Sequence, residues 1–223
     1  VRDQDIKNFY DEQGICHVVL PERGHLTPGK FCVGGDSHSP TGGAFGAYMF
    51  GIGATEMAGV LATGSIWLKV PETILIKWDN QLSPFVTAKD MMLAICRKIG
   101  MGGGRYQAVQ YAGEAIRALG MQDRMTLSNM AAELGAQAGL IAPDETTITY
   151  IENAGGVVAD DWRDYQIEVP DKPGNLLSFD AASLSPQIAA PHSPANADDA
   201  ETFRNTPFDI AYIGACTGAK YVD

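Results

Sequence analysis

Short apolar runs alternate along this chain with stretches of helical periodicity, a pattern typical of the α/β class. Residues 18–20 (Val-Val-Leu) and 31–33 (Phe-Cys-Val) are apolar runs, which predicts two buried strands. From residue 73 to residue 78 apolar and polar side chains alternate, which predicts a third, half-buried strand. The pattern therefore predicts an α/β fold.

Helical patterns occur in three regions. Between residues 41 and 63 small residues interleave with large apolar ones, which predicts two helices packed so closely that glycine is needed at their contacts. Thr87 and the acidic residue three positions later approximate a capping box, and the helix that they begin is expected to end at Gly100. Thr126 is expected to cap a further helix that runs to about Gln137.

Glycine and proline mark the connections. Residues 100–104 (Gly-Met-Gly-Gly-Gly) predict a loop that either brings backbone amides to a ligand or simply ends the preceding helix. Residues 170–174 predict a turn, and residues 186–207, rich in Pro, Ala, Asn and Asp, predict an extended connection. Residues 209–214 then predict a strand that ends in a glycine turn.

Composition narrows the class of protein. The formal net charge is −11 and the 16 Lys and Arg residues are scattered, which argues against nucleic-acid binding. No apolar run approaches the roughly 20 residues of a membrane span, and residues 1–5 do not resemble a signal peptide, so a cytoplasmic protein is expected. Because the chain lacks an initial Met and ends abruptly, we expect an internal fragment of a longer protein.

The four cysteines are too widely and irregularly spaced for a disulfide framework, which favours free thiols or metal ligands. Cys16, Cys32 and Cys96 lie in apolar runs and are predicted to be small core residues. Cys216 stands in Gly-Ala-Cys-Thr-Gly, where small neighbours leave the thiolate accessible. A cysteine at such a turn can bind a metal or a cluster, but one cysteine does not specify which.

Three polar residues, Asp36, Ser37 and His38, follow a predicted strand and precede a glycine-rich stretch. An open α/β sheet binds ligands at such a corner. A carboxylate can orient an imidazole, a hydroxyl can hold a substrate carboxylate, and a histidine can relay protons near neutral pH. The alternative is an ordinary Asp cap with an incidental Ser and His.

Three further polar residues lie outside that corner. His17 precedes a predicted strand, and Asn129 and Glu133 are four residues apart and so share a helix face. A lone histidine is often structural, and amphipathic helices often carry such polar pairs. Both interpretations therefore stay open on local grounds.

Six motifs occur in this chain in a fixed order. They are Cys-His-Val-Val-Leu-Pro-Glu at 16–22, Gly-Asp-Ser-His-Ser-Pro-Thr-Gly-Gly-Ala-Phe-Gly at 35–46, Phe-Gly-Ile-Gly-Ala-Thr-Glu at 50–56, Met-Thr-Leu-Ser-Asn-Met-Ala-Ala-Glu-Leu-Gly-Ala at 125–136, Ala-Pro-Asp-Glu-Thr at 142–146, and Ile-Gly-Ala-Cys-Thr at 213–217. In this order they resemble the aconitase superfamily, most closely the large subunits of its 3-isopropylmalate dehydratases.

The resemblance implies part of a three-domain, cluster-binding core of aconitase-like α/β/α domains. Residues 1–70 would be the C-terminal part of the first α/β domain, and residues 71–180 the second. Residues 181–223 would be a linker and the start of the third domain, which carries the first cluster cysteine.

The resemblance also implies a 4Fe-4S cluster for which Cys216 is the first of three cysteine ligands. The iron without a protein ligand would act as a Lewis acid in hydro-lyase chemistry on a small hydroxy-di- or tricarboxylate. The other two cysteines, the substrate-binding arginines and the serine base would lie outside this chain, so the fragment is expected to be inactive and to hold no cluster alone. The residues with implied roles are His17 paired with Asp36, His38 paired with Glu133, Ser37 on a substrate carboxylate, and Asn129 near the cluster.

The expected partners are a separate small swivel-domain subunit and a small carboxylic acid, with 3-isopropylmalate and leucine biosynthesis the first hypothesis. The family's usual Gly-Ser-Cys-Thr-Asn reads Gly-Ala-Cys-Thr-Gly at residues 214–218, which leaves maleate, 2-methylmalate, aconitate and homoaconitate as alternative substrates. A non-catalytic regulatory relative is the remaining alternative.

Overall fold

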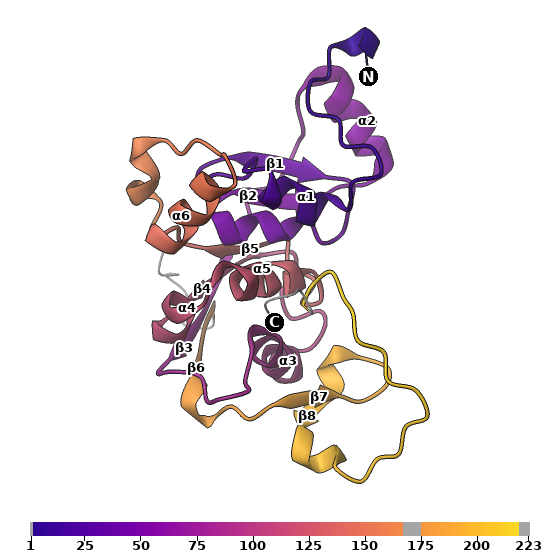
Figure 1. Ribbon diagram of the computed structural model, residues 1–223, viewed down its shortest axis with the longest axis vertical. Coiled ribbons are helices and arrows are strands. Elements are labelled where there is room, and N and C mark those ends of the chain that lie inside the picture. Colours follow the sequence, from indigo (N-terminus) through magenta and orange to yellow (C-terminus); the bar gives the residue numbers. More distant parts are fainter. Residues whose placement is uncertain (1, 167–174, 219–223) are drawn as a thin grey trace.

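The computed structural model describes residues 2–166 and 175–218 (Figure 1). Its centre is a four-stranded sheet in the order β5-β4-β3-β6, in which every pair of neighbours is parallel. A second parallel pair joins β1 to β2, and an antiparallel pair joins β7 to β8. The predicted α/β class is confirmed. The strands are β1 (Phe31–Gly34), β2 (Tyr48–Gly51), β3 (Thr73–Asp79), β4 (Ala108–Ala112), β5 (Ala138–Ile141), β6 (Leu176–Asp180), β7 (Gln187–Ala189) and β8 (Ala197–Asp199).

Helices surround these sheets, and helix α2 projects at the end of the molecule opposite the β7–β8 pair (Figure 1). No helix within the described ranges is both long enough and apolar enough to cross a membrane. The α-helices are α1 (Cys16–Glu22), α2 (Ala54–Thr63), α3 (Ala88–Ile99), α4 (Glu114–Ala118), α5 (Met121–Asn129) and α6 (Glu145–Asn153). The short 3-10 helices are η1 (Arg2–Gln4), η2 (Ser39–Phe45), η3 (Met130–Ala132), η4 (Asp160–Asp164), η6 (Ala181–Ser183), η7 (Pro194–Asn196) and η8 (Ala200–Phe203).

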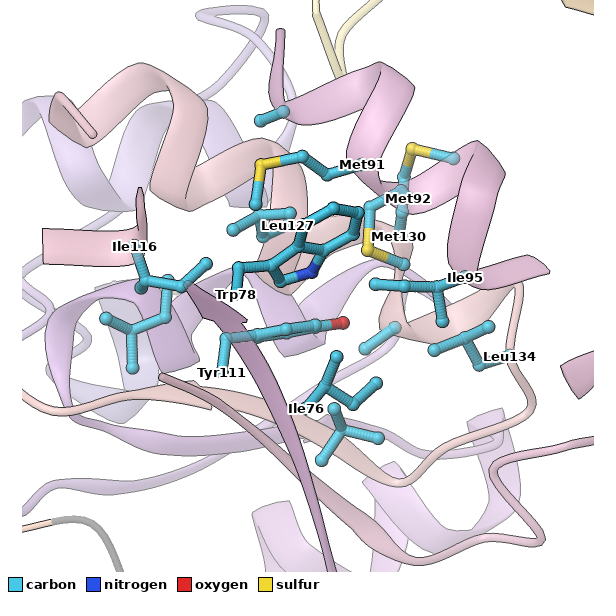
Figure 2. Packing of buried hydrophobic residues seen from close by; sticks show 14 of the residues in the cluster. Ile76, Trp78, Met91, Met92, Ile95, Tyr111, Ile116, Leu127, Met130 and Leu134 are labelled. Carbon is cyan, nitrogen blue, oxygen red and sulfur yellow. The ribbon is translucent and has the colours of Figure 1, made fainter. Parts of the chain in front are cut away.

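The main core lies between the central strands and helices α3 and α5. Figure 2 shows Trp78 and Tyr111, from β3 and β4, facing the methionines of α3. Trp78 also stacks on Phe179 of β6, with ring centroids 4.4 Å apart. Burial of each large apolar side chain contributes about 1.5–3 kcal/mol, so this cluster fixes α3 and α5 on the sheet.

Two predicted elements are confirmed here. Strand β3 covers the alternating segment; on the face opposite Ile76, Leu75 is also buried, whereas Lys77 is exposed. Helix α3 has Thr87 as its N-cap, whose backbone N–H donates to the Asp90 carboxylate at 2.7 Å. It ends before Gly100, which takes a positive φ of 77°.

The first part of the chain differs from expectation. Residues 18–20 belong to helix α1, because an apolar run of that length has no periodicity to separate helix from strand. Residues 41–63 hold η2, strand β2 and α2 instead of two packed helices. The expected close contact at a glycine does occur, because a Cβ on Gly43 would lie 1.8 Å from the backbone oxygen of Gly139 in β5. The element that packs against this glycine is therefore a strand and not a second helix.

Helix α5 begins five residues before the expected cap. Gly120 is its N-cap, and Thr126 lies inside the helix, where its hydroxyl donates to the backbone oxygens of Gln122 and Thr217. The helix ends at Asn129 and a single 3-10 turn follows. The helix therefore ends well before Gln137, where it was expected to end.

The C-terminal predictions also need correction. Residues 186–207 contain the β7–β8 pair rather than a plain connection, and residues 209–214 form no strand. The expected turn at residues 170–174 falls outside the described residues. Of the cysteines expected in the core, Cys96 is buried but Cys16 and Cys32 are only half-buried, because their elements lie near the surface.

An ion pair between buried Arg124 and partly exposed Asp144 anchors helix α5. Arg124, 1% exposed, makes a two-pronged contact with the Asp144 carboxylate, with both N–O distances 2.7 Å. The same guanidinium donates to the backbone oxygens of Leu119 and Arg117 and to the hydroxyl of Thr147. Asp144 is in turn the N-cap of α6. Arg124 thus joins α4, α5 and α6.

Burial tends to raise the pKa of Asp144, but hydrogen bonding and charge from Arg124 outweigh it and lower the pKa below its ordinary value of 3.8. Because the folded-state pKa is lowered, the pair contributes its full stability above the ordinary value. That contribution is lost as the pH falls through the lowered pKa.

Replacement of Asp144 by Ala should lower the free energy of unfolding at neutral pH by about 1–3 kcal/mol, because buried Arg124 loses its charged hydrogen-bond partner, although water at the partly exposed position replaces some of that contact. The measurement is denaturant unfolding followed by circular dichroism. Glu145→Gln is the control, since it removes an exposed ion pair with Arg163 and should cost at most about 1 kcal/mol. Equal losses in the two variants would contradict the anchoring role of Arg124.

Candidate functional site

A tight turn after β1 presents Asp36, Ser37 and His38. The Asp36 side-chain oxygen Oδ1 accepts a hydrogen bond from the His38 backbone N–H at 2.7 Å, which is an Asx turn. The Asp36 backbone oxygen accepts bonds from both the backbone N–H and the hydroxyl of Ser39. β2 passes so close that a Cβ on Gly51 would lie 2.6 Å from that same oxygen. The turn is therefore fixed from both sides.

His17 lies against this turn. It is the second residue of α1 and only 5% exposed, and its Nδ1 is 3.4 Å from Oδ1 of Asp36. The Asp36 side chain remains 39% exposed. The imidazole is thus buried beside a carboxylate that reaches solvent.

His38 faces a second carboxylate. Its Nε2 is 3.4 Å from Oε1 of Glu133, the residue that follows η3. Its Nδ1 lies 3.2 Å from the Ser37 hydroxyl and 3.8 Å from Oδ1 of Asp36. Oε2 of Glu133 is buried and, among the described residues, has no hydrogen-bond partner. This oxygen remains able to accept a proton or a hydrogen bond.

The two histidine–carboxylate pairs adjoin one another. The rings of His17 and His38 are 5.9 Å apart between centroids. A carboxylate beside an imidazole fixes the orientation of the ring and its tautomer. The arrangement can therefore hold and transfer protons at two neighbouring positions. Asp36 both stabilises its own turn, as the capping interpretation expected, and contacts an imidazole from another segment.

Asn129 connects these pairs to the segment that carries Cys216. Its amide donates to the Thr41 hydroxyl, and its side-chain oxygen accepts from the Thr217 hydroxyl, each at 2.9 Å. The Thr126 hydroxyl donates to the backbone oxygen of Thr217 at 2.6 Å. Cys216, which precedes Thr217 in the chain, is exposed. Two hydrogen bonds thus fix Thr217 beside an accessible thiol.

Asp36 and Ser37 also line a cavity of about 420 Å³. Its other walls come from residues at the end of β2 and from the loop before β5. Tyr106 lines it as well, with a φ of 57° that is uncommon for a residue other than glycine. A small carboxylic acid fits a space of this size.

The negative charge of Glu133 helps to raise the pKa values of two groups in the core behind the site. Burial, and after it the Glu133 charge, raises the pKa of Cys96 to about 11. The pKa of Tyr111 is also raised, by burial first and then by Cys96 and Glu133. Cys96 therefore remains a neutral thiol at physiological pH.

Sequence reasoning missed three threonines and one cysteine of the site. Thr41, Thr126 and Thr217 hold Asn129 and its neighbourhood together, and Thr126 was interpreted as a helix cap. Cys16, interpreted as a core residue, lies beside His17 and Asp36. Position within the motifs was the one available signal, because hydroxyl and thiol side chains are common in ordinary helices and cores.

The sequence pattern of the Aconitase family (aconitate hydratase) matches residues 1–211. The chain belongs to the aconitase family. The predicted aconitase-like α/β/α class is confirmed by that match together with the parallel sheets.

Similar proteins cover the whole chain. A protein named probable 3-isopropylmalate dehydratase large subunit from Methanothermobacter thermautotrophicus is 41% identical, and the chain covers 53% of it. A probable methanogen homoaconitase large subunit from Methanosarcina mazei is 43% identical and 56% covered, and the chloroplastic 3-isopropylmalate dehydratase large subunit of Arabidopsis thaliana is 38% identical and 45% covered. The chain spans about half the length of these curated relatives.

Replacement of Gly51 by Ala should displace the Asp36 turn, because the new methyl carbon would meet the Asp36 backbone oxygen at 2.6 Å. We expect a loss of about 1–3 kcal/mol in the free energy of unfolding and shifted imidazole signals of His17 and His38 in NMR spectra. The control is Gly59→Ala on the exposed face of α2, where a Cβ meets nothing within 4 Å. It should stabilise the protein by about 0.5–1 kcal/mol. Unshifted imidazole signals in Gly51→Ala would contradict the close fit.

Proposed function

We propose that this chain is part of the large subunit of a 4Fe-4S-dependent hydro-lyase that acts on 3-isopropylmalate. The observation that carries the proposal is the convergence of two histidine–carboxylate pairs from three separate segments, which Asn129 links through hydrogen bonds to the turn that carries an exposed cysteine. Two of the similar proteins are named as large subunits of 3-isopropylmalate dehydratases. The name large subunit supports a separate small subunit as partner.

In this proposal the chain handles protons and positions the substrate. Asp36 orients His17, and Glu133 orients His38 through Nε2, so that the rings can give a proton to the departing hydroxyl and take one from the returning water. Ser37, exposed beside the cavity, donates a hydrogen bond to a substrate carboxylate. These are the residues whose types match the chemistry of removing and adding water.

The Cys216 thiol and its surroundings suit a ligand to one iron of an iron–sulfur cluster. The thiol is exposed, its flanking residues are small, and Asn129 fixes Thr217 beside it. Within the described residues, Cys216 is not part of any group of three possible metal ligands. In this proposal the other ligands of the cluster therefore come from elsewhere in the protein. When bound, the cluster supplies a Lewis-acidic iron that polarises the substrate hydroxyl.

Replacement of Cys216 by Ala in the full-length protein should abolish the broad visible absorption that anaerobic reconstitution with iron and sulfide produces. Cys32→Ala, which removes a half-buried thiol of β1, is the matched control and should leave that absorption intact. Unchanged absorption in Cys216→Ala would remove Cys216 from the cluster.

Replacement of Asp36 by Asn should lower kcat for 3-isopropylmalate about 100- to 10,000-fold while the cluster absorption stays intact, because the amide no longer orients His17 as a carboxylate does. Asp11→Asn, an exposed acidic position of the N-terminal segment, serves as the control with unchanged kcat. Wild-type kinetics in Asp36→Asn would exclude Asp36 from the site. Parallel assays with homoaconitate test the substrate, given the name of the Methanosarcina relative.

A further inference from the structure

A group of three possible metal ligands, Cys16, His17 and Asp36, lies within the described residues and does not include Cys216. One ligand atom from each of these side chains lies within 4.8 Å of the other two. Cys16 and His17 are the first two residues of α1, and Asp36 comes from the turn after β1. None of the functions proposed above uses the Cys16 thiol.

The geometry is close to that of a bound zinc ion. With bond lengths of about 2.0–2.3 Å, neighbouring ligands around tetrahedral zinc lie roughly 3.3–3.8 Å apart. His17 and Asp36 already meet this spacing at 3.4 Å. The Cys16 sulfur lies within 4.8 Å of the other two ligand atoms, so an approach of at most about 1 Å would bring it into the same range.

We propose that Cys16, His17 and Asp36 bind zinc, and that bound zinc inhibits the protein by occupying the His17–Asp36 pair. The inhibition rests on the proposed function, whereas the binding does not.

The choice of zinc follows from the donor types. A thiolate, an imidazole and a carboxylate form a mixed set that suits zinc, while magnesium and calcium prefer oxygen ligands alone. Three protein ligands leave a fourth position open to water, as in zinc sites that exchange their ion. The two ligands also differ in exposure to solvent. The His17 side chain is enclosed, whereas the Asp36 side chain is 39% exposed and gives a zinc ion access to the site.

Without a metal the Cys16 thiol stays protonated. Burial, followed by the negative charge of Asp36, raises its pKa. A divalent cation would reverse this preference, since a coordinated thiol loses its proton. Zinc binding would therefore release a proton from Cys16.

The test is zinc K-edge X-ray absorption of the purified full-length protein with one equivalent of zinc, which is selective for zinc in the presence of iron. We expect one sulfur at about 2.3 Å and nitrogen or oxygen at about 2.0 Å. In Cys16→Ser the sulfur should disappear and the Kd for zinc should rise at least about tenfold, since loss even of a supporting outer contact costs about 10- to 100-fold. Magnesium should not compete.

The matched control is Cys32→Ser, which should keep both the sulfur signal and the Kd. A sulfur signal that persists in Cys16→Ser, or that disappears in Cys216→Ala, would place the zinc elsewhere and overturn the site. Activity is measured separately. Zinc bound through Cys16 without inhibition would overturn the inhibitory role, and with it the proposed part of His17 and Asp36 in turnover, while the metal site would stand.

Discussion

The buried charge of Arg124 is the constraint on which the rest of this structure depends. A guanidinium enclosed in the fold must be neutralised and hydrogen-bonded, and here Asp144 together with two carbonyl oxygens at the end of α4 does both. This requirement fixes α5 relative to α4 and α6. Asn129 ends that helix and Glu133 follows one turn later, so the position of both polar groups depends on a salt bridge that contacts neither.

The site is then assembled by convergence of separate segments. α1 supplies His17, the turn after β1 supplies Asp36 and His38, and the turn after α5 supplies Glu133. Each contact is modest in strength, but together they confine four titratable groups to one small region. The absence of side chains at Gly43 and Gly51 is what lets the backbones carrying these groups approach one another. The same crowding places a soft thiol beside the catalytic candidates.

Local sequence patterns predicted what depends on local physics. The capping box of α3 and the alternation of β3 were recognisable because each is determined by residues a few positions apart. β4 and β5 were not predicted, because Ala, Gly and Gln interrupt their short apolar runs and leave neither strand a clear alternating pattern. The pairing of His38 with Glu133 spans 95 residues, so it came from the resemblance alone. The domain boundaries at residues 71 and 181 stay predictions.

The strand order has a consequence for how the chain is made. β3 sits between β4, which follows it closely, and β6, which is synthesised about a hundred residues later. During translation one edge of β3, whose Ile74, Leu75, Ile76 and Trp78 are buried in the folded protein, therefore stays without its partner until β6 leaves the ribosome. An unpaired apolar edge invites pairing with another chain. For this fold, the interval between the synthesis of β3 and of β6 is the period of greatest exposure to aggregation.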